Sequence, residues 1–117
     1  MRNQAVLLVD DEFAIVELVG DELSDMGFEV VTARTGAEAL GHMATDKVFD
    51  FIVSDVSMPE GVSGVDVARK ARELQPRARV ILSSGRTRAQ LPDIPDDAEF
   101  LAKPYRLAQL LQLLEPV

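Results

Sequence analysis

The chain has 117 residues, no cysteine and a formal net charge of −8, and hydrophobic residues make up 47% of it. This length suits one compact domain, so we expect residues 1–117 to form a single domain. The lack of cysteine excludes disulfides and thiolate metal sites, and the acidic balance argues against direct nucleic-acid binding. No apolar run approaches the roughly 20 residues of a membrane span, and the first residues do not resemble a signal peptide. We therefore expect a cytoplasmic protein without membrane insertion.

Short apolar runs alternate with helix-patterned segments along the whole chain. Five runs have the length and composition of strands that are buried in a sheet. The expected strands are Val6–Val9, Phe28–Thr32, Phe51–Ser54, Val80–Ser83 and Glu99–Ala102. The alternation predicts an α/β fold with a doubly wound, five-stranded parallel sheet and helices on both of its faces.

Four of the intervening segments have clear helical periodicity. They span about residues 13–26, 35–43, 63–75 and 107–114. Gly27 follows the first of these segments as a helix-stop signal, and Pro76 ends the third. The last segment places four leucines on one stripe, which is typical of a helix packed against a core.

The stretch Arg86–Ala98, between the fourth and fifth strands, fits a regular helix poorly. Pro92 and Pro95 interrupt it, so that only Thr87–Leu91 leaves room for one or two turns. We expect a short or irregular fourth helix here, followed by an extended loop.

Polar residues follow four of the strands at the point where each strand ends: Asp10 and Asp11, then Asp55, Ser84 and Lys103. Taken alone, each has an ordinary explanation, such as a helix N-cap, a turn residue or a surface lysine. In a parallel sheet, however, the carboxyl ends of the strands share one edge, and open α/β sheets bind ligands there. We therefore expect these five side chains to form one site.

This set of side chains favours a particular chemistry. Carboxylate oxygens are the ligands that Mg²⁺ prefers. A metal ion, an ammonium group and a hydroxyl group together neutralise and orient a phosphoryl group. The sequence therefore predicts a site for a divalent cation and a phosphate, in which the Asp55 carboxylate can approach phosphorus.

Four segments together resemble the receiver domains of bacterial two-component response regulators. They are Leu-Leu-Val-Asp10-Asp11-Glu12, Val-Ser-Asp55-Val-Ser-Met58-Pro59, Leu-Ser-Ser84-Gly85 and Ala-Lys103-Pro104-Tyr105. The resemblance covers essentially the full length. It implies a flavodoxin-like strand order of 2-1-3-4-5 and a role in phosphorelay signalling.

The resemblance also assigns the metal site. It implies that Asp55 is the phosphoacceptor and that Mg²⁺ is the cofactor. Asp11 would bind the ion directly and Asp10 mainly through water, and Asp55 and the backbone carbonyl of Ser57 would complete the protein ligands.

The remaining implied roles concern the phosphoryl group and its detection. Lys103 would pair with Asp55 or its phosphoryl group, and a cis bond before Pro104 would orient it. Ser84 would donate a hydrogen bond to a phosphoryl oxygen. Phe100 is either an aromatic switch that turns inward after the Ser84 hydroxyl moves, or simply a core residue. Arg86 flanks the site, and we hypothesise that it reaches toward the phosphoryl group or the attacking water.

As implied partners, a histidine kinase or phosphotransfer protein would phosphorylate the chain, and a downstream protein would read its state. The chain would catalyse only its own phosphoryl transfer and autodephosphorylation. It resembles both single-domain receivers and receivers attached to hybrid kinases. One alternative is a receiver-like interaction module that works without phosphorylation. Another is a Mg²⁺-dependent phosphatase-like enzyme, although no second acid is visible close to Asp55 in the sequence.

Overall fold

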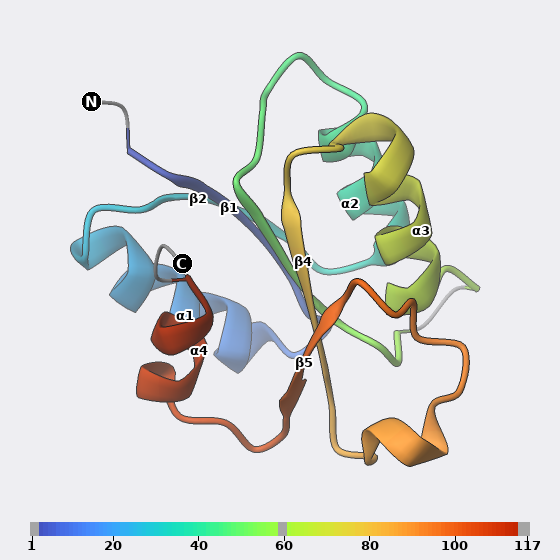
Figure 1. The fold of residues 1–117 in the computed structure, drawn as a ribbon. Coiled ribbons are helices and arrows are strands. Elements are labelled where there is room, and N and C mark those ends of the chain that lie inside the picture. The colour runs from blue at the N-terminus through green and yellow to red at the C-terminus, as the bar shows by residue number, and fades with distance from the viewer. Residues whose placement is uncertain (1–2, 59–60, 115–117) are drawn as a thin grey trace.

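The computed structural model describes residues 3–58 and 61–114, and five parallel strands form its single sheet. The strands are β1 (Ala5–Val9), β2 (Glu29–Ala33), β3 (Phe51–Asp55), β4 (Arg79–Ser84) and β5 (Glu99–Ala102). Their order across the sheet is β2-β1-β3-β4-β5 (Figure 1). The predicted fold class and strand order are confirmed, and each strand lies within one residue of its expected bounds.

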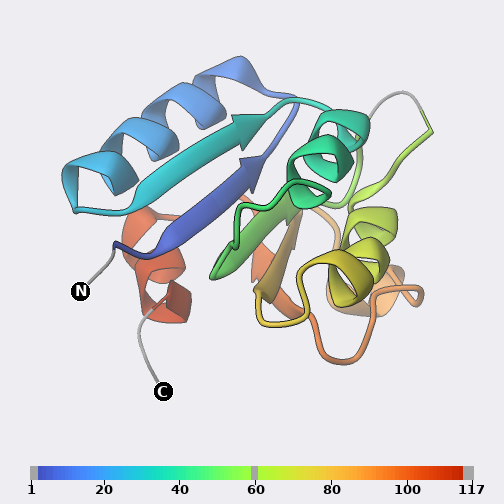
Figure 2. The same cartoon turned by 90° about the horizontal axis from the view of Figure 1, so that it is seen from above.

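Helices cover both faces of the sheet, as Figure 2 shows. They are α1 (Phe13–Asp25), α2 (Gly36–Met43), α3 (Gly64–Leu74) and α4 (Leu107–Leu114). Leu7 and Val9 of β1 pack in the core beneath α2 and α3, whereas Val6 and Leu8 pack in the core beneath α1 and α4. Because successive side chains of a strand point to opposite faces, this central strand is apolar throughout. No helix among the described residues is long and apolar enough to cross a membrane.

The segment Arg86–Ala98 contains a single 3₁₀ turn, η1 (Arg88–Gln90), and then runs irregularly to β5. This confirms the expected short or irregular helix between the fourth and fifth strands. Ile94 and Ala98 are buried against Ala68 of α3, and an ion pair between Arg72 and Asp97 links the segment to the same helix. The segment therefore lies against α3 through a few contacts rather than through a helical stripe.

Gln75 is a buried polar residue that joins the end of α3 to the chain before β3. Its side-chain oxygen accepts a hydrogen bond from the Phe49 N–H at 2.9 Å. Its side-chain nitrogen donates to the backbone oxygens of Met43, at 3.1 Å, and Lys47, at 2.8 Å. One side chain thus satisfies three backbone groups between the end of α2 and the start of β3, which would otherwise be costly to bury.

We expect Gln75→Leu to lower the free energy of unfolding by roughly 2–4 kcal/mol, because it leaves these backbone groups without partners at similar side-chain volume. Chemical denaturation followed by circular dichroism measures the change. Gln112→Leu is the matched control, since Gln112 is exposed on α4 and should change stability by less than about 0.5 kcal/mol. Equal effects of the two substitutions would contradict the bracing role of Gln75.

Candidate phosphorylation site

Strand register brings the predicted site residues to one edge of the sheet. Val9 pairs with Ser54, Asp55 pairs with Ser83, and Ser84 pairs with Ala102. The residues that follow β1 and β5 therefore lie on either side of Asp55. All five predicted side chains come from this carboxyl edge, which is where the sequence placed them.

Asp10, Asp11 and Asp55 form a group of carboxylates whose nearest oxygen atoms all lie within 4.8 Å of one another. Asp10 and Asp55 are buried, whereas Asp11 is exposed. Three carboxylates at this spacing repel one another unless a cation lies among them. The group therefore has the chemistry of a site for a hard divalent cation.

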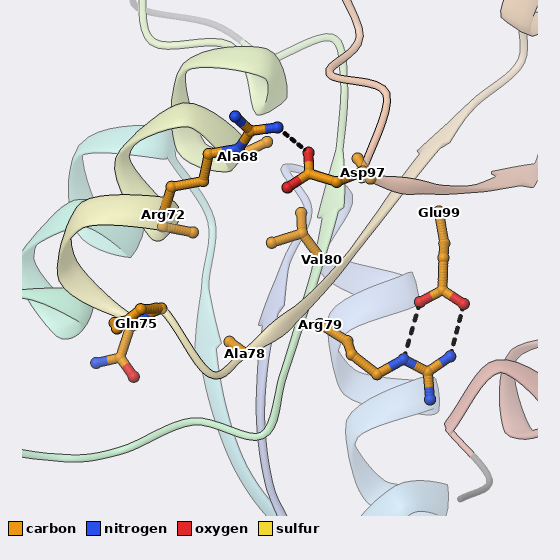
Figure 3. A pocket seen from close by; sticks show the side chains of 11 residues that line it. Ala68, Arg72, Gln75, Ala78, Arg79, Val80, Asp97 and Glu99 are labelled. Carbon is orange, nitrogen blue, oxygen red and sulfur yellow. Dashed lines mark hydrogen bonds and ion pairs between the residues drawn. The ribbon is translucent and has the colours of Figure 1, made fainter. Parts of the chain in front are cut away.

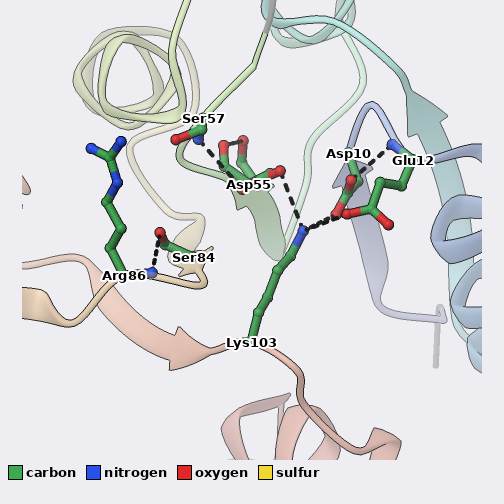
Figure 4. A network of polar contacts seen from close by, with 8 residues as sticks. Asp10, Glu12, Asp55, Ser57, Ser84, Arg86 and Lys103 are labelled. Carbon is green, nitrogen blue, oxygen red and sulfur yellow. Dashed lines mark hydrogen bonds and ion pairs between the residues drawn. The ribbon is translucent and has the colours of Figure 1, made fainter.

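Lys103 supplies a positive charge to this group (Figure 4). Its ammonium nitrogen Nζ lies 2.8 Å from Oδ2 of Asp10 and 3.2 Å from Oδ2 of Asp55. The other oxygen of Asp10 accepts a hydrogen bond from the Glu12 N–H at 2.9 Å. Asp10 thus has two structural roles: it satisfies a backbone donor where α1 begins, and it binds Lys103.

Burial and charge shift the pKa values of Asp55 and Lys103. Burial raises the pKa of Asp55, Lys103 partly opposes this increase, and the Asp10 charge adds to it, so that the pKa lies above its ordinary value. Burial alone would lower the pKa of Lys103, but the hydrogen bond to Asp10 and the charges of Asp10 and Asp55 outweigh it and raise that pKa. Lys103 therefore stays protonated at neutral pH and partly compensates the burial of the Asp55 carboxylate.

The hydroxyl and backbone groups around Asp55 come from the ends of β3 and β4. The Ser57 N–H donates to Oδ1 of Asp55 at 3.4 Å. Ser84 is buried, and its hydroxyl oxygen accepts a hydrogen bond from the Arg86 N–H at 3.0 Å. The Arg86 guanidinium is exposed and makes no hydrogen bond or ion pair with the described residues. Arg86 thus contacts the site through its backbone, and its effect on the phosphoryl group stays a prediction.

Phe100 lies half-buried beside the irregular segment. It packs against the apolar cluster that contains Ile94 and Ala98. This position is compatible with both expectations, because a half-buried ring has a core contact and also room to move. Its role as a switch stays a prediction.

Two residues near the site were not assigned roles from the sequence. Oε1 of Glu12 lies 3.8 Å from Lys103 Nζ. Tyr105 is half-buried, and burial together with the Asp10 charge raises the pKa of its hydroxyl. The adjacency of Glu12 to Asp10-Asp11 and of Tyr105 to Lys103-Pro104 is the only sequence signal for either residue.

Comparison with known proteins identifies the family. The family model of the response regulator receiver domain matches residues 6–115. The chain belongs to this family. It is a receiver domain of two-component systems, and receiver domains are signalling domains that interact with histidine kinases and downstream effectors.

Relatives carry this receiver domain both nearly alone and inside longer proteins. The chain is 28% identical to the response regulator receiver protein CpdR of Brucella abortus, over 94% of this chain and 92% of CpdR. It is 38% identical to the sensor kinase CckA of the same organism, over 92% of this chain but only 12% of the kinase. It spans about a quarter (25%) of the transcriptional regulatory protein GlrR of Escherichia coli, at 32% identity over 94% of this chain.

Solved structures share the fold closely. A response regulator receiver protein from Sinorhizobium medicae matches with a TM-score of 0.86 and 30% identity, covering 94% of this chain and 90% of that one. The chemotaxis protein CheY4 of Vibrio cholerae matches with a TM-score of 0.83 and 32% identity, covering 96% of both chains. As expected for a receiver domain, the bond between Lys103 and Pro104 is cis.

Proposed function

We propose that Asp55 accepts a phosphoryl group from a phosphohistidine and that Mg²⁺ supports the reaction. One observation carries this proposal: the Asp55 carboxylate lies in a group of three carboxylates and also 3.2 Å from the Lys103 ammonium group. Positioning and charge neutralisation are what phosphoryl transfer needs most from a protein.

In the proposed step, a carboxylate oxygen of Asp55 bonds to phosphorus, and the bond from phosphorus to the imidazole nitrogen of the donor breaks. The electron pair of that bond stays on the nitrogen, so a neutral histidine leaves and Asp55 becomes an acyl phosphate. Lys103 pairs with the charge on the phosphoryl oxygens, and the Ser84 hydroxyl donates a hydrogen bond to one of them. Autodephosphorylation is the attack of water on the same phosphorus, which restores the carboxylate and releases inorganic phosphate.

The donor set fits Mg²⁺. Asp10, Asp11, Asp55 and the backbone carbonyl of Ser57 offer only oxygen atoms, which this ion prefers. Because Asp10 already accepts hydrogen bonds from Lys103 and the Glu12 N–H, it suits contact through water, whereas the exposed Asp11 is free to bind directly. When bound, the ion supplies positive charge to the phosphoryl oxygens.

Phosphorylation switches partner binding in this proposal. It adds about −1.5 to −2 charges at Asp55. Movement of the Ser84 hydroxyl toward the phosphoryl group ends its hydrogen bond with the Arg86 N–H, and Phe100 turns inward. The result is a change in the surface formed by residues 86–100, which a downstream protein reads.

The phosphodonor, a histidine kinase or a phosphotransfer protein, has to approach Asp55 across the adjacent surface. The exposed Leu18 makes this side of α1 apolar. A groove of about 470 Å³ separates α1 from the residues after β5 and contains Ile15, Leu18 and Pro104. We assign phosphodonor docking to this surface.

The cytoplasmic location, the absence of nucleic-acid binding and membrane insertion, and the single domain over residues 1–117 stay predictions.

The test is incubation with Mg²⁺ and acetyl phosphate, followed by intact-mass spectrometry. We expect an acid-stable, base-labile phosphoryl adduct that disappears completely in Asp55→Asn and when EDTA removes the metal. Asp46→Asn is the matched control, because Asp46 is exposed and lies outside the site; it should keep the adduct.

Two results would contradict the proposal. Absence of an adduct with acetyl phosphate and with every histidine kinase would favour the interaction module that works without phosphorylation. Rapid multiple turnover of a phosphorylated metabolite would favour the phosphatase-like enzyme.

A further inference from the structure

A groove opens beside Asp55, between the start of α3 and the irregular segment that precedes β5. Its volume is about 530 Å³. Val56 and Ser57, which directly follow Asp55, line it together with Leu91 and Ile94 of the irregular segment. Gln90, the last residue of the 3₁₀ turn η1, also lines the groove.

Apolar side chains form one part of the lining of this groove, beside polar and charged ones. Val56 and Ile94 belong to a buried cluster, and Val65 and Leu91 pack against that cluster. Met58 also lines the groove. These side chains offer an aliphatic group of a ligand an environment away from water, which favours binding.

Two guanidinium groups border the same groove. Arg69 and Arg86 both line it, both are exposed, and neither forms an ion pair with any described residue. Two acids also line it: the Asp66 carboxylate accepts hydrogen bonds from the N–H and hydroxyl of Ser63 in the capping box of α3, and Asp93 is exposed. Neither acid forms an ion pair with Arg69 or Arg86. On a chain with a net charge of −8, two unpaired arginines at one groove favour an anionic ligand.

A second hollow, at the other end of α3, has a different character (Figure 3). It measures about 290 Å³, and its arginines already have partners: Arg72 pairs with Asp97, and Arg79 forms two hydrogen bonds with Glu99, at 3.1 and 2.6 Å. Its charges are therefore satisfied within the chain. Of these two hollows, the one beside Asp55 has unpaired arginines to offer a ligand.

We propose that the groove between α3 and the irregular segment binds a partner-protein segment that carries carboxylate groups next to aliphatic side chains. The aliphatic groups contact Leu91 and Ile94, and the carboxylates pair with Arg69 and Arg86. Phosphorylation weakens this binding, and only this second statement rests on the function proposed above.

The coupling follows from the position of Arg86. Its N–H donates to the Ser84 hydroxyl oxygen at 3.0 Å, so movement of that hydroxyl toward a phosphoryl group releases the backbone of Arg86. The added negative charge at Asp55 attracts the freed guanidinium and repels a carboxylate in the groove. Both effects lower the affinity for an acidic segment, so the partner binds the unphosphorylated domain and leaves after phosphorylation.

The binding test uses the unphosphorylated full chain and a fluorescein-labelled synthetic peptide of alternating glutamates and leucines. Fluorescence anisotropy measures affinity, and amide chemical shifts locate the binding. We expect shifts at residues 63–69 and 86–94, and Arg69→Glu should weaken binding about fivefold, because a favourable exposed charge pair becomes an unfavourable one. Arg77→Glu changes the net charge equally but lies beyond the end of α3 and outside the groove, so it should change affinity less than about twofold.

Several outcomes would overturn the docking site: no binding at millimolar peptide, equal binding of a peptide with glutamine in place of glutamate, equal effects of both arginine substitutions, or shifts confined to α1. Concentration-dependent dimerisation that Arg69→Glu abolishes would assign the groove to a second copy of the chain instead.

Weaker peptide binding after acetyl phosphate treatment, absent in Asp55→Asn, supports the coupling. If Asp55 forms no adduct, the function proposed above fails while the docking result still stands.

Discussion

Lys103→Met is expected to lower the free energy of unfolding by about 3 kcal/mol at pH 7 without divalent cations, because removing one partner of a buried ionic group leaves the others uncompensated. The Asp10 side chain is only 3% exposed and the Asp55 side chain 10% exposed, and both lie within 3.2 Å of the ammonium group that the substitution removes. Because both carboxylates are buried, water cannot easily hydrate them once the ammonium group is gone. Urea denaturation measures the loss, and the variant should also form the Asp55 adduct far more slowly.

The pH dependence of this loss has a definite sign. The pKa of Asp55 is raised in the folded protein, so its contribution to stability is fully present below the unfolded pKa and is lost as pH rises through the folded pKa. Lys103 opposes that increase, so its removal raises the pKa of Asp55 further. The loss in the free energy of unfolding caused by Lys103→Met should therefore be smallest near pH 4 and largest at neutral pH.

Three comparisons isolate the cause of the destabilisation. Mg²⁺ should restore part of the stability of Lys103→Met, because it replaces the missing positive charge. The double variant Lys103→Met/Asp55→Asn should be more stable than Lys103→Met alone, since one of the two uncompensated carboxylates is gone. Lys70→Met is the matched control: Lys70 forms an exposed ion pair with Glu73, and its loss should cost less than about 1 kcal/mol. A loss in the free energy of unfolding that depends on neither pH nor Mg²⁺ would show that Lys103 acts through packing alone.

Gly64→Ala is expected to destabilise the fold by at least about 3 kcal/mol, because the added methyl group overlaps backbone that cannot move aside. A Cβ atom at Gly64 would lie 2.2 Å from the backbone oxygen of Asp55 and 2.8 Å from Cα of Val56. The Gly64 N–H donates to the Val56 backbone oxygen at 2.8 Å, which holds the start of α3 against the end of β3. The substitution therefore displaces the strand end that carries the phosphoacceptor.

The matched control for Gly64→Ala is Gly41→Ala. Gly41 lies within α2, and apart from its chain neighbours and the backbone of its own helix, no described atom lies within 4 Å of a Cβ built there. Alanine is favoured over glycine inside a helix, so this variant should gain about 0.5–1 kcal/mol. Thermal unfolding of both variants and adduct formation with acetyl phosphate check these expectations. A Gly64→Ala protein with wild-type stability and wild-type phosphorylation would show that α3 can shift without disturbing Asp55.

Sequence patterns predicted the strands and helices well for identifiable physical reasons. Strands buried on both faces read as continuous apolar runs, so β1 and β3 were visible within one residue of their bounds. Pro76 marks the end of α3, and two prolines explain why only η1 forms between β4 and β5. These signals act over a few residues along the chain, so no knowledge of the tertiary fold is needed to read them.

Within the site, the sequence by itself determined which chemical groups are present and that they follow strand ends. It thereby predicted a cation and phosphate site at the carboxyl edge of the sheet, and the structure brings three carboxylates together there. Only the tertiary structure decided how these groups pair. The shorter contact of Lys103 is with Asp10, at 2.8 Å, a partner 93 residues away in the sequence. Glu12 and Tyr105 join the same site, and Arg69 lies with Arg86 at one groove. Pairings of this kind depend on strand register and on how helices pack across the sheet, which local periodicity does not encode.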